Sequence, residues 1–189
     1  MGMITRRQLT NLLGALGVVV VLCGLAFGLP AIDRSLPAQR SVPAAQPYPV
    51  GAGVTVIPPP GATLDVTGTR PGQLDGTALF RLGPVRYAIS ARPFGGDLQD
   101  AASRLRKRIT GTTGYQVTGA QLAVSTAGGL SGVQGGYTAP GRGGRYSVFV
   151  TAGLAIEVTV SGDALDLSRS LPQIEASTRT LRYDGEPPR

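Results

Sequence analysis

The chain has 189 residues, a single cysteine and no histidine, and its 18 basic and 11 acidic residues give a formal net charge of +7. The lack of histidine excludes a Ser-His-Asp triad and removes the commonest metal ligand and general base. We therefore predict no catalytic residue, no metal site and no cofactor from the residue types present.

The first predicted element is an apolar run from Leu12 to Leu29 without a charged residue, which is long enough to span a membrane core. Arg6 and Arg7 precede it without an acidic neighbour, so residues 1–11 are expected in the cytoplasm and the C-terminal bulk outside. We expect residues 12–29 to form a single-pass signal-anchor in the cytoplasmic membrane. The main alternative is a cleavable secretory signal with Ala26 and Gly28 at its cleavage site.

Cys23 lies inside this run, where a lipoprotein attachment site is the alternative to a plain hydrophobic residue. Leu22 stands where such a site needs a small residue, so we interpret Cys23 as a small hydrophobe within the span. The exported part then contains no cysteine, so no disulfide supports its fold and no zinc site with Cys or His ligands is available there.

Residues 30–50 form the next segment, which is rich in proline and alanine and has no hydrophobic periodicity. This composition predicts an extended linker between the anchor and the rest of the chain. Residues 51–189 then remain as one extracytoplasmic domain of ordinary size.

Short alternating runs rich in β-branched and aromatic residues predict strands in this domain. They are Gly53–Ile57, Thr77–Leu82, Arg86–Ala91, Gln121–Ser125, Ser131–Thr138, Arg145–Thr151 and Leu154–Ser161. The last two are joined by Ala152 and Gly153 and predict a tight hairpin, and the glycine-rich turn Pro140–Gly144 extends it to a three-stranded meander. Within the last run the alternation places Glu157 on the outer, solvated face.

Two segments have helical spacing. In Asp97–Thr110 apolar residues recur at helical intervals, with acidic residues in the first turn and basic residues in the last. A second helix is expected to begin near Leu171, with Ser170 and Gln173 as a capping box and Pro172 in the first turn, while residues 163–168 form a lead-in turn. Its apolar stripe comprises Leu167, Leu171, Ile174, Thr178 and Leu181.

These elements predict an α+β domain, an antiparallel sheet with helices packed against it, preceded by one transmembrane helix. Their order resembles the PsbP-like family, which includes an accessory protein of photosystem II and actinobacterial envelope proteins of the LpqN type. The resemblance rests on Val85–Ala91 leading into Asp97–Thr110, then Leu130–Tyr137, Tyr146–Val160 and a terminal helix ending in Ser177-Thr178-Arg179-Thr180-Leu181. It implies a PsbP-like layered fold and an accessory or binding role, with no shared catalytic residues.

Five basic residues are candidate anion contacts: Arg104, Lys107 and Arg108 on the first helix, and Arg142 and Arg145 at the glycine-rich turn. The competing interpretation is structural, because cations stabilise the C-terminal end of a helix and glycine-rich turns are common between strands. Acidic wall polymers or anionic lipid head groups are the expected targets if these residues bind. Nucleic acid is not expected, because aromatic residues are too few for a stacking platform.

The sequence therefore favours a non-catalytic accessory or interaction domain of the bacterial cell envelope, with the membrane and a further envelope protein as partners. The alternative is a ligand-binding module for an anionic or hydrophobic envelope molecule. An apolar pocket beside the sheet would favour that alternative. An enzyme would require carboxylates that converge in a pocket with perturbed pKa values.

Overall fold

The computed structural model describes residues 38–185. The predicted anchor, residues 12–29, and the cytoplasmic segment, residues 1–11, lie outside the described residues. In the part that is described, no helix combines the length and the apolar character needed to cross a membrane. The compact unit that carries the strands begins at Gln39.

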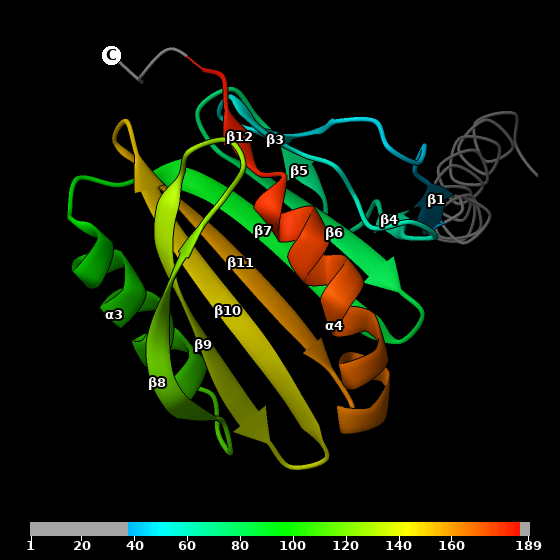
Figure 1. Cartoon of the computed structure of the whole chain (residues 1–189), viewed down its shortest axis with the longest axis vertical. Helices are drawn as coiled ribbons and strands as arrows, with labels where there is room; N and C mark the ends of the chain where they lie inside the picture. Colours follow the sequence, from blue (N-terminus) through cyan, green and yellow to red (C-terminus); the bar gives the residue numbers. More distant parts are fainter. Residues whose placement is uncertain (1–37, 186–189) are drawn as a thin grey trace, which may run out of the picture. The chain divides into compact units, whose positions relative to one another are not determined.

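An antiparallel sheet of nine strands forms the centre of this unit, in the order β1-β4-β6-β7-β11-β10-β9-β8, with β5 paired to β6 (Figure 1). Its strands are β1 (Gln39–Ser41), β4 (Thr63–Asp65), β5 (Arg70–Pro71), β6 (Gly76–Leu82), β7 (Val85–Pro93), β8 (Gln116–Ser125), β9 (Ser131–Ala139), β10 (Arg142–Thr151) and β11 (Leu154–Gly162). A smaller sheet has the order β12-β3-β2 and contains β2 (Tyr48–Gly51), β3 (Val54–Val56) and β12 (Arg182–Tyr183).

The predicted meander is confirmed by the pairing of β9, β10 and β11. Thr151 pairs with Leu154, so Ala152 and Gly153 form a two-residue turn, and both have positive φ (46° and 73°). This geometry matches the right-handed twist of the flanking strands, which explains why the turn is tight. The hairpin lies where the sequence predicts it, but β10 begins at Arg142 and not at Arg145, so three residues of the predicted turn Pro140–Gly144 belong to the strand.

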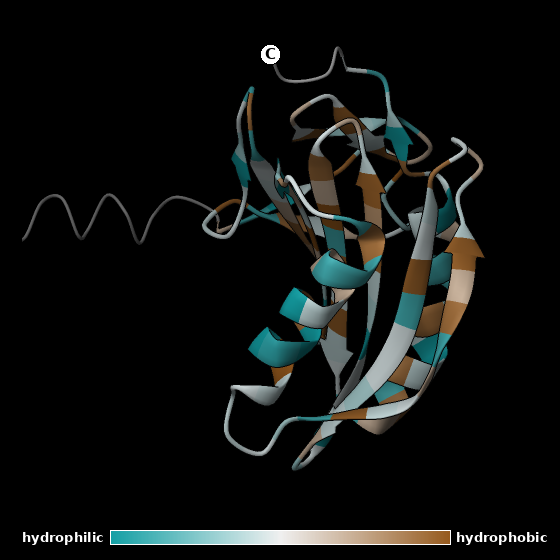
Figure 2. Cartoon of the chain, turned by 90° about the vertical axis from the view of Figure 1, so that its left-hand side faces the viewer, coloured by the Kyte–Doolittle hydropathy of each residue, from teal (hydrophilic) through white to brown (hydrophobic). Residues whose placement is uncertain are grey.

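Helix α3 (Leu98–Thr110) confirms the first predicted helix. The backbone N–H of Asp100 donates to the Asp97 carboxylate at 2.8 Å, and the Asp100 side chain reaches back to the Asp97 backbone, which completes a capping box. Ala101, Ala102 and Leu105 are buried against the sheet, while the outer side of α3 is hydrophilic (Figure 2). The helix is therefore positioned by one narrow apolar stripe.

Helix α4 (Ala164–Arg179) corrects the second helix prediction, because it begins two turns before Leu171. Its N-cap is Asp163, whose carboxylate accepts hydrogen bonds from the backbone N–H groups of Leu165 and Asp166 at 3.0 and 2.9 Å. This cap satisfies two of the N-terminal N–H groups that have no partner within the helix. Pro172 lies inside the helix on its exposed side, where water can satisfy the carbonyl that proline leaves without a donor.

The predicted linker, residues 30–50, differs from the structure over its second half. Strand β1 pairs with β4, and β2 pairs with β3 and ends next to Val50, which is fully buried. Proline is tolerated here because β2 is an edge strand, and Pro49 itself is exposed. Residues 39–50 therefore belong to the domain.

The two faces of the large sheet are covered at opposite ends. The small sheet and α4 cover β6, β7 and β11 on one face, where Phe80, Tyr87, Ile156 and Ile174 belong to one core. Helix α3 covers β8, β9 and β10 on the other face, where Tyr146 and Val148 belong to a second core. Each face is therefore left partly open at the end that its cover does not reach.

Candidate binding groove

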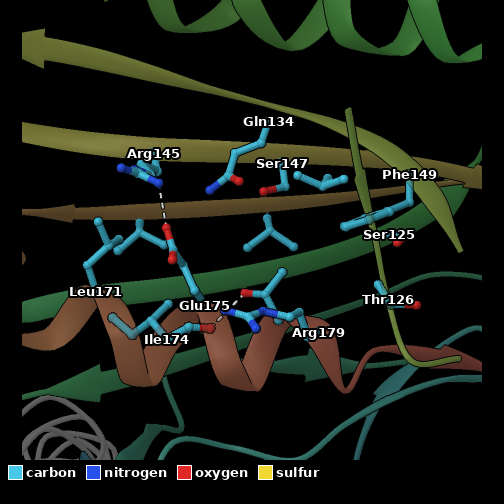
Figure 3. Close-up of a pocket in the computed structure, with 14 residues that line it drawn as sticks. Ser125, Thr126, Gln134, Arg145, Ser147, Phe149, Leu171, Ile174, Glu175 and Arg179 are labelled. Atoms are coloured by element: carbon cyan, nitrogen blue, oxygen red, sulfur yellow. Dashed lines mark hydrogen bonds and ion pairs between the residues drawn. The ribbon is translucent and has the colours of Figure 1, made fainter. Parts of the chain in front are cut away.

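A groove of about 270 Å³ lies between α4 and the part of the sheet that curves past it (Figure 3). Its floor comes from β8, β9, β10 and β11, and its wall comes from α4. The apolar lining residues are Val124, Phe149, Val158, Val160, Leu171 and Ile174, and the polar ones are Ser125, Thr126, Gln134, Ser147, Thr178, Arg145, Glu175 and Arg179. This volume is close to the lower end of the range for small-molecule pockets.

The groove is hollow because β9 presents little side-chain volume on this face. Strand alternation places Gly132, Gln134 and Gly136 toward α4, opposite Phe149, Ser147 and Arg145 of β10. A Cβ at Gly132 would collide with the Phe149 ring, so glycine lets that ring lie flat against β9. The depression is thus encoded by glycines that the sequence places at alternate positions.

An ion pair stands at one end of the groove, where Arg145 of β10 and Glu175 of α4 point toward each other across the gap (Figure 3). The Arg145 side chain is 44% exposed and the Glu175 side chain 31% exposed. The helical spacing of the segment does not by itself indicate this pair. The tertiary structure brings an arginine from a distant strand against it.

The groove has the chemistry of a binding site. Glu175 is the single carboxylate among its lining residues, and it is paired with Arg145. Ser147 is buried beside Gln134 and Val158, with no histidine in the chain to activate it. An apolar floor beside a guanidinium can hold a molecule that has an apolar body and a negatively charged end.

The five predicted anion contacts do not form one cluster. Arg145 lies in the groove, whereas Arg108 belongs to the opposite face of the sheet. Arg104 lies over the Phe94 ring at 4.9 Å, and Lys107 lines the same hollow beside that ring. Arg142 is exposed at the turn between β9 and β10. Anion binding by each of them stays a prediction.

Glu157 is a carboxylate that the structure places differently from the sequence prediction. Its side chain is only 11% exposed, and both carboxylate oxygens accept hydrogen bonds from the Arg108 guanidinium at 2.7 and 3.0 Å. The alternation of β11 correctly puts it on the face away from α4, but α3 crosses that face and brings Arg108 to it. Arg108 in turn has a raised pKa because it donates to Glu157.

Sequence reasoning missed most of the groove. The sequence predicts Phe149, Val124 and the glycines of β9 only as members of strands. A usable signal was present, since Gly132, Gln134 and Gly136 alternate on a single face. The position of α4, which turns that face into a groove, has no local signal.

No family model matches the chain, and no curated protein matches it. Among solved structures, the solution structure of cyanobacterial PsbP (CyanoP) from Synechocystis sp. PCC 6803 is similar, with a TM-score of 0.53 and 16% sequence identity. The match covers 76% of this chain and 94% of that chain. The domain thus has a PsbP-like α+β fold, as the element order predicted.

Proposed function

We propose that this chain is a non-catalytic accessory domain of the bacterial cell envelope that binds an amphipathic molecule in the groove between α4 and the sheet. The observation that supports this proposal is the groove itself, an apolar hollow with Arg145 at one end. Of the two functions that the sequence favours, ligand binding receives this direct geometric support.

The proposed ligand has an apolar segment and an anionic end group. The apolar segment would lie against the half-buried side chains of Val124 and Leu171, above a floor of fully buried core residues that cannot rearrange without disturbing the core. The anionic group would take the place of Glu175 at Arg145, which presents a guanidinium suited to a carboxylate or phosphate. About 270 Å³ corresponds to roughly nine water molecules at ~30 Å³ each, so a short chain fits better than a large cofactor.

Placement outside the cytoplasmic membrane is part of the same proposal. It is supported by the charge-free run Leu12–Leu29 and by Arg6 and Arg7 before it. A phosphatase fused after Arg189 should be active in intact bacteria, and a reporter that works only in the cytoplasm should be inactive there. The reverse pattern would overturn the topology.

The ligand proposal is tested with residues 39–189 and a dansyl-labelled eleven-carbon carboxylic acid, whose fluorescence rises in an apolar site. We expect saturable binding that unlabelled decanoate displaces, with decanol weaker because it lacks the charge. Butyrate should not compete, because it lacks the apolar segment. Equal competition by butyrate and decanoate would show that the apolar groove is not the site.

Two substitutions on one strand provide a matched pair for this assay. Gln134→Trp fills the groove from β9 and should abolish probe binding. Thr138→Trp places the same side chain on the same face of β9 but outside the groove lining, and should leave binding unchanged. If both variants bind the probe as the wild type does, the ligand does not enter this groove.

A protein partner is a second candidate, favoured by the edge of the large sheet. In the described part of the chain β8 pairs only with β9, which leaves its other edge unpaired along ten residues, and Leu122 on it is 64% exposed. Such an edge can accept a strand from another protein. Crosslinking in intact cells through a photoreactive residue at Leu122 should then capture one defined partner, and a matched probe at Ser168 of α4 should not.

A further inference from the structure

A second hollow lies on the face of the sheet opposite the groove, at the end that α3 leaves open. Its volume is about 410 Å³. Its floor is formed by residues of β6, β7 and β11, and its wall by α3 and the segment that follows it. Its lining residues include Thr77, Ala88, Ser90, Arg92, Tyr115 and Thr159.

The shape of this hollow follows from side-chain length. Thr77 pairs with Ser90, which pairs with Glu157, and Ala88 pairs with Thr159, so short side chains occupy adjacent positions across three strands. An open sheet face usually carries long polar side chains that reach into water. Here Thr77, Ser90 and Thr159 give the floor hydroxyl groups, and the long side chain of Glu157 among them is held by Arg108 of α3.

The charge around the hollow is positive. Glu157 is neutralised by its two hydrogen bonds from Arg108, whereas Arg92 makes no ion pair within residues 38–185. Burial raises the pKa of Tyr137, which also lines the hollow, to about 12, and Arg142 and Arg86 are near enough to its hydroxyl to oppose that rise. Arg92 and Arg108 are the guanidinium groups that line the recess, and Arg108 is already paired with Glu157.

Tyr115 supplies an aromatic surface beside this floor. It is half-buried, and its ring lies 5.9 Å from the ring of Tyr137, centroid to centroid. The Tyr137 hydroxyl is already committed, since it donates to the Val160 carbonyl at 2.8 Å. The two rings thus form a fixed wall with an apolar face, next to hydroxyl groups that can exchange hydrogen bonds with a ligand.

We propose that this hollow is a second binding site, separate from the groove, for an anionic saccharide unit. The sugar hydroxyls would bond to Thr77, Ser90 and Thr159, and the ring would lie against Tyr115. The negative group, a phosphate or a carboxylate, would pair with Arg92 at the rim. A neutral sugar lacks the charge that this rim selects, and a small anion alone lacks the hydroxyl contacts of the floor.

The test is calorimetric titration of the full chain in a polyoxyethylene detergent, which contains no sugar. The probes are glucuronate, glucose 6-phosphate, glucose and inorganic phosphate. At least one charged sugar should bind at least about tenfold more tightly than glucose and than phosphate, as one charge-assisted contact predicts. The two charged sugars distinguish a carboxylate ligand from a phosphate ligand.

Three variants assign any binding to the hollow. Ala88→Phe fills the floor and Arg92→Gln removes the rim charge, and each should weaken binding about tenfold or more. Arg169→Gln removes an equal charge from an exposed position of α4, on the other face of the sheet, and should have no effect. Binding of neither charged sugar, equal binding of glucose, or an equal loss in the Arg169 variant would overturn the proposal.

Discussion

Replacement of Ile174 by alanine should cost about 3 kcal/mol of unfolding free energy. Ile174 is fully buried on α4, in the core that contains Tyr87 and Ile156. The change removes three carbon groups at about 0.8 kcal/mol each, roughly 2.4 kcal/mol, and the cavity left behind adds to this. The cavity contribution should be small, because Ile174 borders the groove and the space it leaves can join that hollow.

Urea unfolding of residues 39–189 measures this loss, with Gln173→Ala as the control on the same helix. Gln173 is exposed, so its replacement should change stability by less than about 0.5 kcal/mol. The melting temperature of the Ile174 variant should fall by roughly 6–12 °C, at about 2–4 °C per kcal/mol for a domain of this size. Similar losses in the two variants would refute the orientation of α4 and, with it, the groove.

Three further predictions follow from other parts of the fold. Residues 39–189 should melt cooperatively, whereas residues 51–189 should be less stable in the same thermal scan, because the shorter segment lacks β2 and the buried Val50. Gly144→Ala should lower stability by about 1–3 kcal/mol in urea, since the new Cβ would collide with a tyrosine ring and a strand carbonyl. A hydrogen bond from a threonine hydroxyl holds the pKa of Asp65 below its usual range. The ionised carboxylate therefore stabilises the fold above pH ~4, and this stabilisation is lost as the pH falls through the folded-state pKa. In an acid titration, the unfolding free energy of Asp65→Asn should fall less steeply between about pH 5 and pH 2 than that of the wild type.

Local sequence determined the elements whose signals are short in range. The alternation in β10 and β11 and the turn at Ala152 and Gly153 predicted the hairpin that the structure contains, although β10 begins three residues earlier, at Arg142. Helix α3 was predicted for the same reason, because its cap, its charges and its apolar stripe all lie within fourteen residues. The order of these elements was enough to indicate the PsbP-like fold.

Tertiary structure decided the features that depend on distant partners. Residues 39–50 read as a linker because nothing local shows that β4 and β3 will accept them as strands. The beginning of α4 was misplaced because Pro172 signals a helix start, whereas Asp163 and the packing of the helix on the sheet extend it backward.

The charged residues at the two hollows also depend on distant partners. Strand alternation and helical spacing alone do not bury Glu157 or Glu175. In the structure each is paired with an arginine, which lies 49 residues away for Glu157 and 30 residues away for Glu175. The hollows exist because α3 and α4 cover opposite faces at opposite ends of one sheet. The local backbone sets which side chains share a face of a strand or helix. Which part of each sheet face stays open depends on where α3 and α4 pack, and only the tertiary structure determines their positions.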